Sequence, residues 1–141
     1  MNRRNRALLR ALAPLALMGL IFYFSAQPAA AHHAWWVVVA RKLGHVTGYA
    51  LLTALWAWAL QGVVRRPVLV AVGIALAYAC TDEFHQTFVR GREGTPRDIA
   101  IDAVGMAIAA WLIRLRRVAP TRWGRTDARG RAPKSSLARS P

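Results

Sequence analysis

Acidic residues are scarce in this chain, and cysteine is almost absent. Six of the 141 residues are Asp or Glu, against twenty Lys and Arg. The single Cys80 excludes a disulfide within the chain, and we interpret it as a small packing residue because no positively charged neighbour would activate it. The basic residues lie at the ends and turns of apolar segments and do not alternate with aromatic residues, which argues against nucleic-acid binding.

Apolar residues make up 55% of the chain, and the mean hydropathy is +0.24 despite the many basic residues. Together with the length, this predicts one small membrane protein domain. The predicted membrane segments cover residues 8–25, 43–64, 67–88 and 98–115. The expected fold is all-α, a four-helix transmembrane bundle in residues 1–117. A cleavable signal peptide ending near residues 28–31 is the alternative for the first segment.

Two stretches outside these segments have separate interpretations. Residues 34–40, AWWVVVA, are too short to span a membrane, and their paired tryptophans favour an interfacial or re-entrant piece. His32 and His33 are neighbours that point to different sides, so we expect a solvated loop and no metal pair. The basic tail, residues 118–141, has no apolar period and is expected to be disordered, either weakly attracted to anionic lipid or inert.

The distribution of basic residues predicts the orientation. Fifteen Lys and Arg lie in residues 1–10, in the 65–66 turn or from Arg114 onward, whereas five lie in the other two loops. Basic residues are enriched in cytoplasmic loops, so both termini are expected in the cytoplasm. The protein would then be a multi-pass membrane protein, with loops 27–42 and 89–97 facing outward.

Five of the six acidic residues lie between Asp82 and Asp102. In the predicted topology, this run and the start of the second helix lie at the outer membrane edge. Helical spacing places the polar residues of each helix along one face. Small residues at Gly105 and Ala109 permit close helix packing there. The predicted pocket contains nine polar residues from three helices and one loop: Lys42, His45, Tyr49, Asp82, Glu83, Gln86, Arg92, Asp98 and Asp102.

Four motifs together resemble the VanZ-like family: KLGHVTGY from Lys42, DEFHQTFVRGR from Asp82, DIAIDAVG from Asp98, and FYFSAQP ending the first segment. The resemblance covers about residues 20–112. It implies a bacterial cell-envelope protein of the inner membrane, in a family named for a member associated with antibiotic resistance to teicoplanin. It does not imply a known reaction. Relative to the family, Asp102 replaces a frequent asparagine, and we expect Lys42 or Arg92 to balance its charge.

Three classes of function fit this pocket. The first is binding or modification of a cell-envelope amphiphile, with membrane lipids and a lipid-linked envelope precursor as partners. An enzyme is the second class, with His45 or Glu83 as general base and Lys42 and Arg92 neutralising a phosphate. The third is structural, with Lys42, Arg90, Arg92 and Arg97 pairing with the carboxylates.

The sequence shows no metal-ligand spacing, so we expect neither a metal nor another cofactor. His85 adjoins Asp82 on the predicted helix and is expected to be its hydrogen-bond partner.

Overall fold

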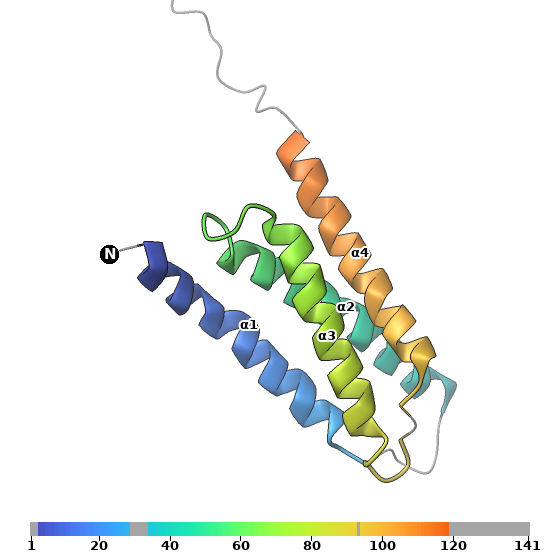
Figure 1. Ribbon diagram of the computed structural model, residues 1–141. Coiled ribbons are helices and arrows are strands. Elements are labelled where there is room, and N and C mark those ends of the chain that lie inside the picture. Colours follow the sequence, from blue (N-terminus) through green and yellow to red (C-terminus); the bar gives the residue numbers. More distant parts are fainter. Residues whose placement is uncertain (1–2, 29–33, 93, 119–141) are drawn as a thin grey trace, which may run out of the picture.

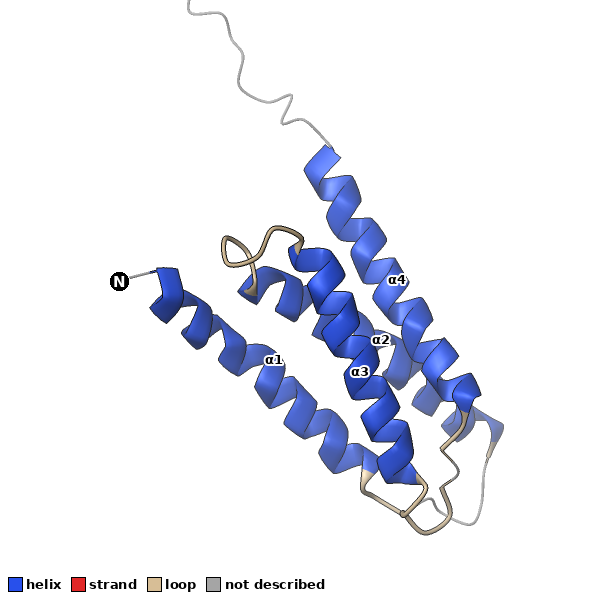
Figure 2. Cartoon of the chain, in the orientation of Figure 1, coloured by secondary structure: helices blue, strands red, loops and turns tan. Residues whose placement is uncertain are grey.

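A computed structural model describes residues 3–28, 34–92 and 94–118 as four helices joined by short connections (Figure 1). The helices are α1 (Arg3–Ser25), α2 (Trp35–Ala59), α3 (Pro67–Gln86) and α4 (Pro96–Val118). Within these ranges all regular secondary structure is helical (Figure 2), which confirms the predicted all-α class. His32, His33 and the tail beyond residue 118 lie outside the described residues, so the predictions for them stay predictions.

The helices run up and down, so that α1 and α3 end where α2 and α4 begin (Figure 1). Helix α2 is central, because it packs against α1, α3 and α4. The core is thin and contains mostly small or medium side chains. Ala75 and Ala79 of α3 are fully buried and bring it close to Tyr49 and Leu52 of α2, with Met106 of α4 beside them.

Many large apolar side chains lie on the outside of the bundle. Leu12 and Phe24 of α1, Leu69 of α3 and Trp111 of α4 are among them. Among the described residues, Asn5–Ser25 and Pro67–Gln86 are long and apolar enough to cross a membrane. Helix α2 carries Arg41 and Lys42 within its length, and α4 carries charged residues near both of its ends. The composition of α1 and α3 therefore favours a membrane protein, although it identifies two candidate spans and not four.

Several predicted boundaries are wrong. Residues 34–40 do not form a separate interfacial piece, because α2 begins at Trp35 and continues through them. No proline interrupts this stretch, so the short apolar run becomes the first turns of a longer helix. Helix α4 begins at Pro96, before the predicted Asp98, since proline fits the first helical turn. Cys80 is exposed on α3, so it does not fill a packing position in the bundle.

Candidate functional site

The nine predicted site residues lie toward the end of the bundle where α1 and α3 finish and α2 and α4 start, with Tyr49 the deepest, near the middle of α2. Helical spacing accounts for part of this arrangement, because residues three or four apart share one face. Five of the nine side chains are buried: Tyr49, Asp82, Glu83, Gln86 and Asp102. The network they form has two parts, one joining α1 to α3 and the other joining α2 to α4.

The first part is centred on Asp82, which lies near the end of α3. Its Oδ2 accepts a hydrogen bond of 2.8 Å from Ser25 Oγ of α1 and one of 3.0 Å from Gln86 Nε2. The same amide nitrogen donates to Glu83 Oε1 at 3.2 Å, so Gln86 bridges two adjacent carboxylates. Because both acids are buried, these donors offset part of the cost of removing negative charge from water.

Arg92 connects the loop after α3 to the end of α1. Its Nη2 donates to the carbonyl oxygen of Phe24 at 2.8 Å, and its Nε donates to that of Gln27 at 2.9 Å. Its Nη1 donates to Gln86 Oε1 at 3.2 Å. The guanidinium thus caps the end of α1, where the Phe24 carbonyl also accepts a bond from the Gln27 N–H at 3.3 Å. A guanidinium has about five N–H donors, so these bonds leave donors free for a ligand.

Burial and a second arginine both affect the Arg92 guanidinium. Burial lowers the pKa of its guanidinium, and the positive charge of Arg41 lowers this pKa further. The two basic side chains line the same pocket. An anion bound there would reduce the repulsion between them.

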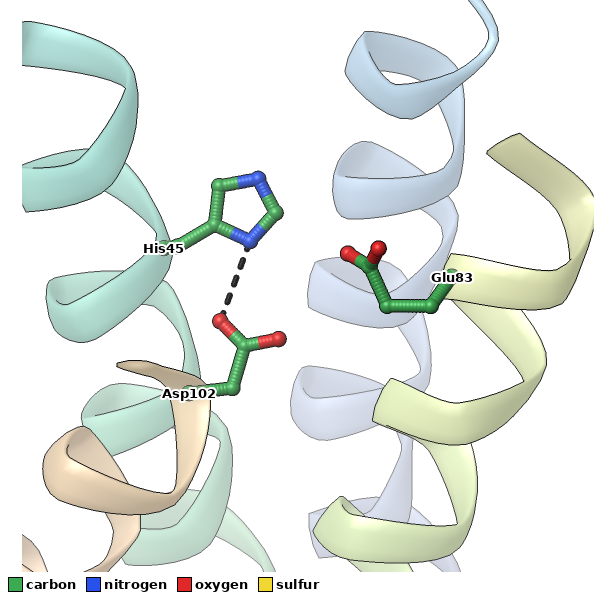
Figure 3. A group of neighbouring side chains, drawn as sticks. All are labelled: His45, Glu83 and Asp102. Carbon is green, nitrogen blue, oxygen red and sulfur yellow. Dashed lines mark hydrogen bonds and ion pairs between the residues drawn. The ribbon is translucent and has the colours of Figure 1, made fainter. Parts of the chain in front are cut away.

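The second part of the network joins α2 to α4 through His45 and Asp102. His45 Nδ1 lies 3.0 Å from Asp102 Oδ1, and the Asp102 side chain is 0% exposed (Figure 3). The predicted partners of Asp102, Lys42 and Arg92, are therefore wrong. Lys42 Nζ lies 3.5 Å from Asp98 Oδ1 instead, in a more exposed ion pair.

Thr95 holds the start of α4 against α3. Its backbone N–H donates to Glu83 Oε2 at 3.0 Å, and its hydroxyl donates to Asp98 Oδ2 at 3.0 Å. Thr95 precedes Pro96, the first residue of α4, and its position suits a residue that caps a helix. The bond to Glu83 fixes the depth at which α4 begins relative to the end of α3.

Gly105 permits the close approach that lets His45 reach Asp102. A Cβ added at Gly105 would clash with the backbone of Val46, the residue after His45. Asp102 lies about one helical turn before Gly105. Gly105, which was predicted to permit close helix packing, therefore allows direct contact between the backbones of α2 and α4.

Two adjoining pockets open beside this network. The larger has a volume of about 640 Å³ and is lined by polar and charged groups, including Arg41, Lys42, Arg92 and Asp98. The smaller has a volume of about 230 Å³ and is mainly apolar, with Ile21, Phe24 and Gly48 among its walls. His45 lines both pockets, whereas Asp82, Glu83 and Asp102 line neither and lie buried behind them.

Comparison with known proteins gives a family for this fold and site. A family model described as VanZ/LLP1 matches residues 11–117. The chain belongs to the VanZ/LLP1 family. This confirms the predicted VanZ-like resemblance over all four helices. No curated protein and no solved structure matches the chain.

Membership of the VanZ/LLP1 family and the two apolar helices together favour a membrane protein. Of the nine residues predicted partly from the family motifs, Lys42, His45, Gln86, Arg92 and Asp98 line the larger pocket. Tyr49 lines the smaller pocket, and its buried hydroxyl has no hydrogen-bond partner among the described residues.

Sequence reasoning missed three residues of the site. Ser25 is the final helical residue of α1 and lies within the FYFSAQP motif, which could have identified it as a partner for an acid on another helix. Thr95 stands three residues before Asp98, a spacing typical of a helix start. Arg41 gave no signal, because its place on the pocket wall depends on how α2 is rotated.

The expected pairing of His85 is wrong, and part of the pairing named in the structural alternative is not found among the described residues. His85 does not bond to Asp82; its ring stacks on Phe22 of α1 with centroids 4.5 Å apart. Arg90 and Arg97 form no ion pair with the carboxylates of the described chain, whose ion pairs are Lys42 with Asp98 and His45 with Asp102. The buried acids rely on hydrogen bonds from neutral groups more than on arginine.

Proposed function

We propose that this VanZ-like chain is an integral protein of the bacterial inner membrane, with four spanning helices and both termini in the cytoplasm. The many exposed apolar side chains support membrane insertion of all four helices, including Leu51 of α2 and Trp111 of α4. The start of α1 and the end of α4 lie at the same end of the bundle as the 60–66 turn (Figure 1). The richly basic segments thus share one side, as cytoplasmic segments commonly do.

In this orientation the two pockets face outward, and we propose that they bind a cell-envelope amphiphile with an anionic head group. The observation that carries this proposal is the presence of Arg41, Lys42 and Arg92 around one pocket of about 640 Å³. Within the described residues Arg41 makes neither a hydrogen bond nor an ion pair through its side chain. An unpaired cation facing a pocket, with two more cations beside it, suits a phosphate or carboxylate.

The smaller pocket suits the apolar part of the same ligand. Ile21 and Phe24 supply apolar walls, and Gly44 and Gly48 leave part of α2 without side chains. A Cβ added at Gly44 would meet nothing within 4 Å, so the space beside it is open. An amphiphile could therefore place its head group among the cations while its chain leaves through the apolar side.

Photo-crosslinking tests this binding directly. Purified full-length protein would be loaded with phosphatidylglycerol carrying a photoactivatable group near the glycerol, and the labelled peptides would be identified by mass spectrometry. We expect labelling of the residue 21–28 and 41–49 peptides. The double variant Arg41→Gln with Lys42→Gln should reduce labelling several-fold, because it removes two cations from the pocket.

The matched control is Arg65→Gln with Arg66→Gln, which removes the same charge at the other end of the bundle. It should leave labelling of the pocket unchanged. Labelling confined to the 65–66 turn, or equal loss in both double variants, would contradict the proposed pocket.

Cysteine labelling tests the proposed topology on intact cells. In a Cys80→Ser background, a cysteine introduced at Arg90 should react with an impermeant maleimide, whereas one introduced at Arg65 should react only after lysis. Both positions are exposed in the structure, so access to the side chain is matched. The reverse pattern would show that the orientation is inverted.

A second candidate function is acid or base catalysis on a lipid-linked head group. It is favoured by the pairing of His45 with the buried Asp102 at the wall of both pockets, since a carboxylate commonly orients a catalytic imidazole. The test is release of inorganic phosphate from a polyprenyl diphosphate by purified protein. Activity lost in His45→Gln, with lipid labelling retained, would support an enzyme.

The family name also motivates a phenotype. We propose that the chain contributes to tolerance of teicoplanin-type glycopeptides, through the envelope amphiphile that it binds. Bacteria expressing the pocket variant Arg41→Gln with Lys42→Gln should then resemble bacteria without the protein in susceptibility, at equal protein abundance.

A further inference from the structure

Three potential metal ligands converge at the centre of the polar network. His45, Glu83 and Asp102 come from α2, α3 and α4, and each offers one ligand atom within 4.8 Å of the others. Figure 3 shows the Glu83 carboxylate facing the imidazole and the carboxylate of Asp102. Glu83 is 3% exposed and Asp102 is 0% exposed, so this cluster differs from the acidic clusters common on protein surfaces.

A second observation concerns the oxygen of Asp102 that does not contact His45. This buried atom, Oδ2, has no hydrogen-bond partner among the described residues. In Figure 3 it points toward the carboxylate of Glu83. A buried carboxylate oxygen without a donor is costly, and a second carboxylate in front of it adds repulsion. A bound cation or a shared proton between the two acids would remove both costs.

The cations of the described chain do not supply enough of that charge. Asp82, Glu83 and Asp102 are all buried, whereas Lys42 pairs with the more exposed Asp98. Arg92 reaches the acids only through Gln86 and directs its other bonds to backbone carbonyls. If all three acids are ionised, a divalent cation together with Arg92 would balance their charge, with His45 neutral.

We propose that His45, Glu83 and Asp102 bind a divalent first-row transition cation, with Zn²⁺ or Mn²⁺ as the best match. One imidazole and two carboxylates suit such ions, whereas Ca²⁺ prefers about six to eight oxygen ligands. Metal–ligand bonds of about 2.0–2.2 Å place ligand atoms roughly 3 to 4 Å apart, so small side-chain rotations would close the site. Each carboxylate oxygen of Glu83 keeps a lone pair for the ion beside its present hydrogen bond.

Three protein ligands leave at least one coordination position for another molecule. His45 lines both pockets, so this position would be reached from the pocket side. A water or an anionic oxygen of a ligand could occupy it. The metal site itself rests on the three ligands and the unpartnered oxygen, and it does not depend on the proposed amphiphile.

Metal titration of the full-length protein tests the proposal. Protein purified in detergent and stripped with a chelator would be titrated with Mn²⁺, followed by electron paramagnetic resonance, and with Zn²⁺ in competition with a chromophoric chelator. We expect saturable binding of about one equivalent, with Zn²⁺ tighter than Mn²⁺. A large excess of Ca²⁺ should not displace either ion.

The variants Glu83→Gln and Asp102→Asn should each weaken binding at least tenfold, about the effect of losing a supporting contact at a metal site. Asp98→Asn is the matched control, because it removes the same charge one turn from Asp102 without touching a proposed ligand. It should keep the wild-type affinity. Helix content by circular dichroism and elution in gel filtration would report whether each variant is folded.

The wild-type titration decides the proposal even if the variants fail to fold. Absence of saturable binding would overturn it, as would full displacement by Ca²⁺. Equal weakening in Asp98→Asn and Asp102→Asn would also overturn it, since this would indicate general attraction of cations to an acidic surface.

Discussion

The contact between Gly105 and the backbone of Val46 gives the sharpest stability prediction. In Gly105→Ala the new methyl group would clash with a carbonyl, which cannot rotate away as the end of a side chain can. Overpacking of this kind costs about 1–3 kcal/mol. Alanine also gains up to about 1 kcal/mol over glycine inside a helix, so the net loss should be about 0–2 kcal/mol.

Gly73→Ala separates these two effects. Gly73 lies inside α3, and a Cβ added there would meet nothing within 4 Å. The gain in helix propensity is common to both variants, so Gly105→Ala should be less stable than Gly73→Ala by about 1–3 kcal/mol, the steric cost alone. Reversible unfolding in mixed detergent micelles, followed by circular dichroism, measures this difference. Equal stability of the two variants would refute the close approach of α2 and α4.

Three further substitutions test the polar network through the same unfolding assay. Ser25→Ala removes a donor to the buried Asp82 and should cost about 1–2 kcal/mol. Arg92→Lys should cost about 2 kcal/mol or more, because an ammonium cannot reproduce the forked set of bonds to three acceptors. Lys42→Met should cost less than about 1 kcal/mol, since its ion pair with Asp98 is exposed, yet it should weaken lipid labelling.

Matched variants give the controls for the first two substitutions. Thr81→Ala removes an exposed hydroxyl that bonds only to a carbonyl of its own helix, so a loss similar to that of Ser25→Ala would argue against a special role for the bond to Asp82. Arg90→Lys changes an exposed arginine near Arg92. If it destabilised the protein as much as Arg92→Lys, the contacts of Arg92 would not be the cause.

The sequence was most informative about the number of helices. Each long apolar segment became a helix, and the Arg66–Pro67 pair correctly marked the start of α3, because proline suits the first turn. The start of α2 was predicted wrongly because the tryptophans of AWWVVVA were interpreted as a membrane-surface anchor. Such an anchor and the first turn of a long helix have the same composition, and only packing against neighbouring helices distinguishes them.

Positions within the site were more predictable than contacts. The i, i+3 and i, i+4 rules brought polar residues to one end of the bundle, but they describe one helix at a time. The distance between His45 and Asp102 depends on the approach of α2 and α4 at Gly105. Residue spacing along either helix cannot predict this distance. The same limit explains His85, whose ring faces α1 and stacks on Phe22.

Helix α1 contributes contacts to the site even though it carries no acidic residue. Ser25 supplies a donor to Asp82, and the carbonyls of Phe24 and Gln27 accept from Arg92. Farther along, the hydroxyl of Tyr78 donates to the carbonyl of Met18 at 2.6 Å. Without α1, a buried carboxylate and a guanidinium at the pocket would both lose partners, which is costly away from water. These contacts favour a role for α1 as a permanent member of the bundle over that of a cleaved signal peptide.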